Sequence, residues 1–418
     1  MKRAHAVLFS LVRFCALALA LPVAVVPAAP AAFAAEPTVI LLSWDGVRWD
    51  YPDMRPFPGL GRIEREGLRA EKLIAGWPSI TFPGHVTMAT GTWADVHGIV
   101  DNKFVDRKRG LYDYSKDADW IDAEPLWIAA ERQGVKAATY FWVGSETDWH
   151  GRGASYRVTP FDGAVFEDVK VDKILSWLDL PEADRPHLVM SYWHGTDHVA
   201  HDNGPDGPVV LDALAGQDVQ LVRLLDGIDA RGLWPTTTLL LVSDHGMTEV
   251  SDFFDLADFM AAHGIKGKFA SSGPLVQVFL DDPSQAPALV EALKSQSGLH
   301  AYRGDDLPAT MHLHHPTRTG DVVVYADPPK AISRVPWYQQ IVFEIGHACC
   351  GVRRGTHGYD PNLPDMGGIL MALGRGVPKG MRAPAASQID IAPTVAKLLG
   401  IAPPLNAIGQ PVPAIEAP

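Results

Sequence analysis

The chain has 418 residues, of which 47% are hydrophobic, and this is enough apolar material for one large α/β domain or for two domains. Its formal net charge of −13 at pH 7 gives an acidic surface that repels a phosphate backbone, so polymeric nucleic acid is not an expected partner. Its three cysteines are too few for a disulfide framework.

The first 35 residues have the pattern of a secretory signal peptide. Lys2, Arg3 and Arg13 flank or precede a short apolar stretch at 14–26, and a run of alanines and prolines ends in a small-residue cleavage site near Ala34 or Ala35. A transmembrane anchor is the alternative, but prolines interrupt the stretch and it is short for a span. We therefore expect a periplasmic or secreted protein without a membrane span after cleavage. Losing the three basic residues would change the formal charge from −13 to −16.

Strand-like apolar runs alternate with helical patterns along residues 36–418, which predicts one catalytic α/β domain with a mostly parallel sheet covered by helices on both faces. The predicted strands are 39–43, 137–142, 187–193 and 237–242, the predicted helices are 83–90, 124–133 and 209–228, and segment 367–373 and helix 389–399 close the fold. The pattern changes at about 267–348. There, the strands 275–279 and 321–325 and the helix 286–293 indicate a small inserted α+β subdomain.

Polar residues follow several of these strands, and they are residue types that bind metal ions or attack phosphorus. An open α/β sheet presents its active site at the carboxyl ends of its strands. Three aspartates and three histidines around one threonine suit two divalent cations and a metal-activated nucleophile. The set is Asp45, Thr81, Asp197, His201, Asp244, His245 and His357. The sequence therefore predicts a two-metal hydrolase whose partner is a small phosphate ester.

Each signal also has an ordinary structural explanation. Asp197 and His201, four residues apart on one face of a helical turn, suit one metal, but this spacing also occurs by chance. Asp244 and His245 end a buried strand, where a satisfied hydrogen-bond pair or a helix cap is the alternative. His357 lies between glycines that allow close approach to an ion, or that form a tight surface turn. The metal-site interpretation depends on these signals occurring together.

Thr81 lies just before the predicted helix 83–90, where a threonine is most often only an N-cap. The same hydroxyl would also face a helix N-terminus, which favours a phosphate group. A metal ion on its oxygen would lower the hydroxyl pKa enough for attack, so that no Ser-His base is needed. The two roles remain alternatives at this point.

The segments that carry these residues have a recognisable order. They read SWDGVRWDY, TFPGHVTMATG, HGIVDN, FWVGSE, YWHGTDHVAHDNGP, SDHGM and GTHGYD. Together they resemble the nucleotide pyrophosphatase/phosphodiesterase family of the alkaline phosphatase superfamily, across nearly all of the mature chain. The resemblance implies an alkaline-phosphatase-like fold and two Zn²⁺ per chain.

Site residues can be assigned through this resemblance. One zinc would be held by Asp197, His201 and His357, and the other by Asp45, Asp244, His245 and the Thr81 oxygen. Asn102 would donate to a non-bridging phosphate oxygen together with the Phe82 backbone N–H. Phe82 and Tyr192 match the aromatic pair that stacks on a nucleobase, although core packing is the alternative for Tyr192.

The implied activity is hydrolysis of nucleotide-like phosphodiester or phosphoanhydride bonds through a covalent phosphothreonine intermediate. A phosphomonoesterase and a lipid-headgroup phosphodiesterase are alternatives on the same site, and a degenerate secreted binding protein is the non-enzyme alternative. Superfamily monoesterases have an added Lys or Arg that binds the extra negative charge of a phosphate monoester. The segment Trp142 to Ser145 instead resembles the diesterase pattern, which favours diesters. Gly84 departs from the family, which usually has Asn there.

Some remaining polar groups have no assigned role. His312, His314 and His315 could form a third metal site or an exposed loop. Adjacent Cys349 and Cys350 could form a vicinal disulfide, remain thiols or pair with a partner.

Overall fold

The centre of the molecule is built from the strands whose sequences are apolar throughout. The computed structural model describes residues 36–271, 273–334 and 337–416, so the predicted signal peptide lies outside the described residues. Every residue is buried in β1 (Thr38–Trp44), β8 (Leu188–Trp193) and β9 (Thr237–Val242). β1 pairs in parallel with both β8 and β9. The predicted central strands are therefore confirmed.

These strands belong to an eight-stranded sheet with the order β19-β2-β18-β9-β1-β8-β6-β7. β6 (Ala137–Tyr140) and β7 (Tyr156–Val158) extend the parallel half. On the other side, β18 (Leu370–Gly374) runs antiparallel to β9 and to β2 (Leu68–Ala70), and β19 (Met381–Ala383) forms the edge. The predicted mostly parallel α/β sheet is confirmed, with one antiparallel strand inside it.

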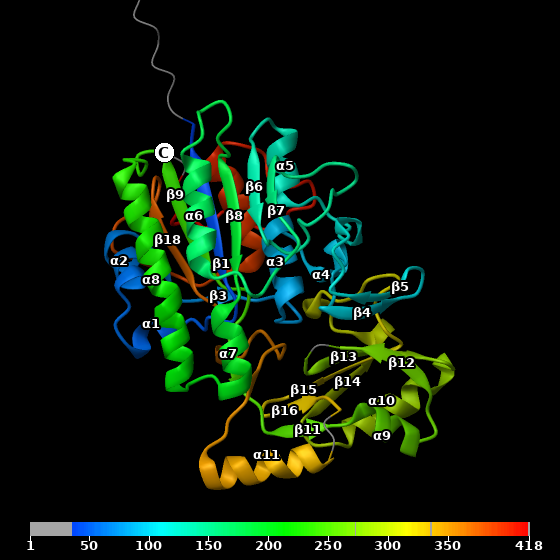
Figure 1. Cartoon of the computed structure of the whole chain (residues 1–418). Helices are drawn as coiled ribbons and strands as arrows, with labels where there is room; N and C mark the ends of the chain where they lie inside the picture. The colour runs from blue at the N-terminus through cyan, green and yellow to red at the C-terminus, as the bar shows by residue number, and fades with distance from the viewer. Residues whose placement is uncertain (1–35, 272, 335–336, 417–418) are drawn as a thin grey trace, which may run out of the picture. The chain divides into compact units, whose positions relative to one another are not determined.

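Helices cover both faces of this sheet, because successive residues of a strand point to opposite sides. Ile40 and Leu42 pack against one set of helices, and Val39 and Leu41 against the other. The first set is α2 (Pro58–Glu66), α6 (Glu167–Leu178) and α8 (Pro208–Ala230), and the second is α3 (Thr81–Thr90), α5 (Leu126–Arg132) and α12 (Ile391–Leu399). Figure 1 shows α6 and α8 crossing the front of the sheet.

The predicted insertion is a four-stranded antiparallel sheet in the order β12-β13-β15-β14. Its strands are β12 (Gly267–Ala270), β13 (Leu275–Leu280), β14 (Leu299–Arg303) and β15 (Val322–Ala326), so the prediction missed two strands. The helices α9 (Leu256–Ala262) and α10 (Ala286–Lys294) share one hydrophobic core with these strands. That core begins at Leu256, which precedes the predicted boundary at 267.

Short elements connect these layers. They are α1 (Tyr51–Met54), β3 (Leu73–Ile74), α4 (Ala94–His97), β4 (Lys103–Asp106), β5 (Gly110–Asp113), α7 (Gly195–Asn203), β10 (Thr248–Glu249), β11 (Asp252–Phe254), β16 (Lys330–Ile332), α11 (Trp337–Cys350), β17 (Gly355–Thr356) and β20 (Ala386–Ser387). Cys349 and Cys350 form a vicinal disulfide at the end of α11. Within the described ranges, no helix has both the length and the apolar character needed to cross a bilayer.

Candidate active site

Polar residues follow the three central strands at one edge of the sheet. Asp45 comes directly after β1, Asp244 and His245 follow β9 after Ser243, and Asp197 lies in α7, which follows β8. Because β1, β8 and β9 are parallel neighbours, their carboxyl ends bring these side chains together. Asp45, Asp244 and His245 are almost completely buried.

Asp45, Asp244 and His245 form the first cluster. Their ligand atoms all lie within 4.8 Å of one another. The Nε2 atom of His245 is 3.3 Å from Asp45 Oδ1 and 3.3 Å from Asp244 Oδ2. The backbone N–H groups of Gly46 and His245 both donate to Asp244 Oδ1, which fixes this carboxylate.

A second cluster lies beside the first and contains Asp197, His245 and His357, again within 4.8 Å. His357 Nε2 is 3.6 Å from Asp197 Oδ1, and His201 Nε2 is 3.3 Å from Asp197 Oδ2. The sequence-based assignment placed His245 with one metal only. In the structure the ring centroids of His245 and His357 are 3.6 Å apart, and His245 belongs to both clusters. His201 lies at the edge of the second cluster.

The three imidazoles of these clusters are oriented in the same way. Each Nδ1 faces a backbone carbonyl: His201 faces Gly355, His245 faces Gly246 and His357 faces Ser79. Because a carbonyl oxygen can only accept, each Nδ1 carries a proton, and each Nε2 faces the carboxylates, where the neutral imidazole can offer its lone pair to a metal ion. Metal-binding histidines are typically held by this arrangement.

The charges of the site also suit a bound cation. Burial, together with the charge of Asp45, raises the pKa of Asp244 well above its ordinary value. Burial opposes protonation of His245, yet the carboxylates of Asp244 and Asp45 outweigh it and raise the pKa of His245 to about 10. Asp45 Oδ1, Asp197 Oδ1 and Asp244 Oδ2 are buried without a hydrogen-bond partner among the described residues. Divalent cations would allow these carboxylates to ionise together, so the donor set fits metal ions.

Thr81 is the first residue of α3, and its hydroxyl makes no capping hydrogen bond. The N-cap interpretation is therefore wrong, because Ile80 occupies that position. Instead, Thr81 Oγ1 lies 3.2 Å from His245 Nε2, next to both clusters.

Gly84 explains how the start of α3 approaches the metal cluster so closely. A Cβ atom at this position would lie 3.0 Å from the carbonyl oxygen of Asp244 and 3.2 Å from its Cβ. The side chain of Gln388 donates to the same carbonyl and accepts from the backbone of Gly76. Gly84, which replaces the usual Asn of the family, therefore allows α3 to pack closely against Asp244. The helix still begins at Thr81.

Asn102 is fixed by the head of α3. The backbone N–H of Phe82 donates to Asn102 Oδ1 at 2.8 Å, so this N–H is not free to bind phosphate as its predicted companion role requires. The Nδ2 atom of Asn102 remains to donate, and its partner is the Tyr114 hydroxyl at 3.5 Å. Both Asn102 and Thr81 line the same cavity.

The side chain of Tyr192 contacts both a candidate metal ligand and the cavity. Its hydroxyl donates to Asp45 Oδ2, and its ring packs edge-on against His85, with ring centroids 4.9 Å apart. Burial and the charge of Asp45 raise the pKa of Tyr192, so the phenol remains a neutral donor. The ring also lines the cavity near Phe161. Tyr192 therefore supports a candidate metal ligand in addition to forming the cavity wall.

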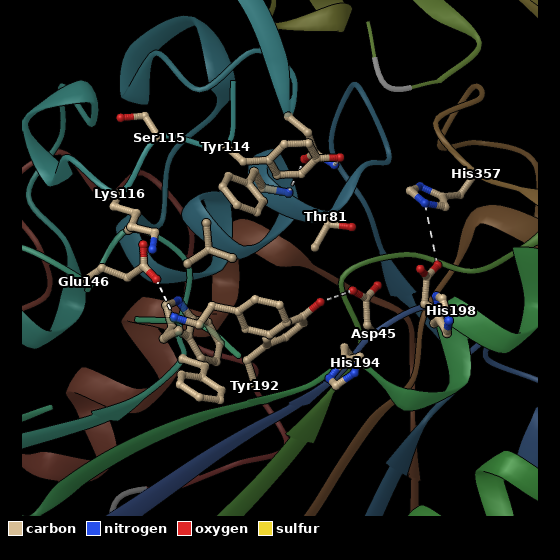
Figure 2. Close-up of a pocket in the computed structure, with 18 of the residues that line it drawn as sticks. Asp45, Thr81, Tyr114, Ser115, Lys116, Glu146, Tyr192, His194, His198 and His357 are labelled. Carbon is tan, nitrogen blue, oxygen red and sulfur yellow. Dashed lines mark hydrogen bonds and ion pairs between the residues drawn. The ribbon is translucent and has the colours of Figure 1, made fainter. Parts of the chain in front are cut away.

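The cavity in front of Thr81 has a volume of about 550 Å³. Sequence reasoning missed four of its lining residues, which are Tyr114, Ser115, Lys116 and Phe161. Four others lie in the segments that carry the family resemblance, although none was assigned to substrate binding, and these are Phe141, Glu146, His194 and His198. In Figure 2, Lys116 and Glu146 lie together on the wall far from His357. Phe82 and Tyr114 meet edge-to-face with centroids 5.1 Å apart, so aromatic groups form much of the wall next to Thr81.

The other histidines considered in the sequence lie outside the two clusters. His85 is buried, and its Nδ1 donates to the Thr81 carbonyl, whereas His97 contacts Thr87 in the core. Two of the three histidines in the insertion pair with Asp95 and with Asp122, and the third faces a backbone carbonyl. In the part of the chain that the structure describes, these three do not converge on one point.

Comparisons with known proteins identify the family of the chain. A family model described as type I phosphodiesterase / nucleotide pyrophosphatase matches residues 39–360. A pyrophosphatase/phosphodiesterase of Schizosaccharomyces pombe, named as uncharacterized, is 32% identical over 81% of this chain and 71% of its own length. Venom phosphodiesterase of Naja atra is 30% identical over 88% of this chain, which spans only 45% of that enzyme.

Solved structures are similar over most of the chain. Human ectonucleotide pyrophosphatase / phosphodiesterase 5 superposes with a TM-score of 0.79 and 26% identity, covering 89% of this chain and 97% of that one. An inactive threonine-to-alanine variant of the murine protein, in complex with AMP, gives a TM-score of 0.79 and 25% identity, with 88% and 96% covered.

Proposed function

Because the chain belongs to the type I phosphodiesterase / nucleotide pyrophosphatase family and has its alkaline-phosphatase-like fold, we propose that it hydrolyses nucleotide-like phosphodiester or phosphoanhydride bonds. We further propose that the reaction uses two Zn²⁺ ions and a covalent phosphothreonine intermediate on Thr81.

One observation carries this proposal. The Thr81 hydroxyl lies 3.2 Å from His245 Nε2, the atom that belongs to both clusters of metal-ligand groups. A nucleophile at the junction of two cation sites can attack a phosphorus atom whose oxygens contact both cations. The related murine structure supports this role, because its inactive form is a threonine-to-alanine variant.

The protein groups that we propose to hold the ions are those assigned through the family resemblance, and the two clusters and the contact of His201 with Asp197 support them. Asp45, Asp244 and His245 would hold one ion together with the Thr81 oxygen, and Asp197, His201 and His357 would hold the other. When bound, the ions would lower the pKa of the threonine hydroxyl and offset charge on the phosphate oxygens.

Thr81 would then form a bond to phosphorus while the bond to the leaving oxygen breaks and that oxygen takes the electron pair. The hydroxyl proton of Thr81 passes to water. The Nδ2 of Asn102 would donate to a non-bridging oxygen, because its Oδ1 is held by the Phe82 N–H. Hydrolysis by a water molecule would cleave the bond between Thr81 and phosphorus and restore the free hydroxyl.

The aromatic wall supports a nucleotide as the other end of the substrate. Phe82 and Tyr114 meet on one side of the cavity, and Phe161 and Tyr192 lie on another part of its wall. Flat rings of this kind can stack on a nucleobase. The AMP complex of the murine relative is consistent with such a ligand.

We also propose that residues 1–35 are removed as a signal peptide and that the mature protein, residues 36–418 as one catalytic domain, acts in the periplasm or outside the cell. The relatives named as venom and ectonucleotide enzymes support this location.

A comparison of two chromogenic substrates tests the function. The protein loaded with zinc should hydrolyse the p-nitrophenyl ester of AMP, a diester, with a higher kcat/KM than p-nitrophenyl phosphate. Preference for the monoester would favour a phosphomonoesterase, and preference for p-nitrophenyl phosphocholine would favour a lipid-headgroup phosphodiesterase. Binding of AMP without hydrolysis of any substrate would favour the secreted binding protein.

A further inference from the structure

A second cavity, of about 420 Å³, also has His201 on its wall. His201 and Asp202 of α7 form one wall, and other lining residues are Phe253, Ser333, Arg354 and Thr356. His201 lines both this cavity and the one in front of Thr81, whereas Thr81 and the aromatic pairs Phe82–Tyr114 and Phe161–Tyr192 line only the first. His201 therefore borders two spaces, and the two spaces differ in chemistry.

Arg354 gives the second cavity a positive charge. The guanidinium carbon of this half-buried side chain lies 4.9 Å from the ring centroid of Phe343, which supports it. Arg354 makes no ion pair with any residue in the described ranges, whereas its neighbour Arg353 is paired with Glu249 at 3.1 Å. A guanidinium group without a carboxylate partner is suited to bind a phosphate through two hydrogen bonds.

Because the second cavity shares His201 with the first, a leaving group that passes His201 can enter it. Thr81 attacks from the side of the first cavity, and in-line displacement sends the leaving oxygen away from the nucleophile. With the nucleotide end among the aromatic residues, the leaving group would pass Asp197 and His201 and reach the second cavity. Arg354 lies on its wall.

We propose that the second cavity is a subsite for the phosphorylated end of the leaving group, with Arg354 as its phosphate-binding residue. The proposal rests on the function proposed above and specifies the substrate class. Substrates that release pyrophosphate or another phosphorylated fragment are favoured over those that release a neutral alcohol. The carboxylate of Asp202, which is exposed and lines the same cavity, weakens this preference.

The test compares two substrates that share their nucleotide and differ in the leaving group. These are adenosine triphosphate, which releases pyrophosphate, and the p-nitrophenyl ester of AMP. Arg354→Gln should lower kcat/KM for adenosine triphosphate by about 10- to 100-fold, because a charged hydrogen-bond pair is lost. The same substitution should change kcat/KM for the ester by less than about twofold.

Two further variants sharpen the test. Arg353→Gln is the matched control, because this neighbouring arginine is paired with Glu249, and it should leave both substrates unchanged. Asp202→Asn removes the negative charge from the cavity wall and should raise kcat/KM for adenosine triphosphate while sparing the ester.

An equal loss on both substrates in Arg354→Gln would overturn the subsite, because Arg354 would then support the fold or the metal site. No loss on adenosine triphosphate would also overturn it. If the wild-type protein hydrolyses neither substrate, the proposed function fails. In that case, calorimetry measures the binding of pyrophosphate to the zinc-loaded protein. The subsite is supported only if binding is weaker in Arg354→Gln and unchanged in Arg353→Gln.

Discussion

The central sheet and the inserted subdomain arrange their strands differently, and this difference determines where chemistry can occur. The fully buried strands β1, β8 and β9 run parallel and end at one edge. The strands of the insertion are antiparallel, with β13 fully buried and β14 alternating between buried and partly exposed positions. A strand covered on both faces cannot carry unpaired polar groups, so polar residues gather at its ends. The central sheet therefore assembles the candidate active site, and the insertion contributes walls and packing.

Metal removal should have the largest effect on activity, because the candidate metal ligands belong to the central region. Dialysis against a chelator should reduce diester hydrolysis to background, and two zinc ions per chain should restore it, because the buried carboxylates of the clusters require cations. Metal analysis together with turnover measures this. Full activity in protein shown to lack metal would remove the cation sites from the mechanism.

Thr81→Ala separates the nucleophile from the metal ligands within the central region. Activity should fall at least about a thousandfold, because the attacking oxygen is lost. Bound zinc should remain, because the aspartate and histidine ligands are intact. Thr81→Ser, which keeps a hydroxyl, is the control and should retain most of the activity. A Thr81→Ala protein with wild-type turnover would exclude this residue as nucleophile.

The contact between the regions should affect stability rather than catalysis. Arg318 of the insertion donates to Asp106 at 2.9 Å, and both side chains are 3% exposed. Arg318→Met leaves a buried carboxylate unpaired and should cost about 3–5 kcal/mol of unfolding free energy. Arg107→Met, which removes a more exposed pair with Asp321, should cost less than about 1 kcal/mol. Denaturant unfolding measures both, and equal losses would contradict this account.

The same contact has a defined pH dependence. Burial opposes ionisation of Asp106, but hydrogen bonds, first from Arg318 and then from the backbone N–H groups of Lys108 and Arg109, together outweigh it and lower the pKa of Asp106 to about 2. A lowered pKa in the folded state stabilises the protein above the ordinary carboxyl pKa, and this contribution is lost as the pH falls towards about 2. The wild-type protein and Arg318→Met should therefore become more similar in stability below about pH 4.

Tyr192→Phe should give the smallest of these effects. It removes the hydroxyl that donates to Asp45 and keeps the ring in the cavity wall. Zinc affinity should fall by about 10- to 100-fold, as is typical when a partner of a metal ligand is lost. A chelator competition assay measures this affinity. Weaker binding of AMP with unchanged zinc affinity would instead indicate that Tyr192 acts only on the nucleobase.

Sequence periodicity predicted the central strands and the residues at their ends, but it predicted few of the residues that form the cavity wall. Asp45 and Asp244 could be placed together, because each ends a fully apolar run and parallel strands end at one edge. The walls formed by Tyr114 and Phe161 could not be predicted, because both lie in loops whose course depends on tertiary packing. The fit of Gly84 against Asp244 likewise joins segments that are distant in sequence.

The most direct test of the central claim is the stereochemical course at phosphorus. A diester made chiral at phosphorus with sulfur and a heavy oxygen isotope would be hydrolysed by the zinc-loaded protein, and the configuration of the product would be determined. Attack by Thr81 followed by attack by water inverts the centre twice, so the account predicts overall retention. Overall inversion would mean that water attacks the substrate directly, and it would contradict the covalent intermediate on Thr81.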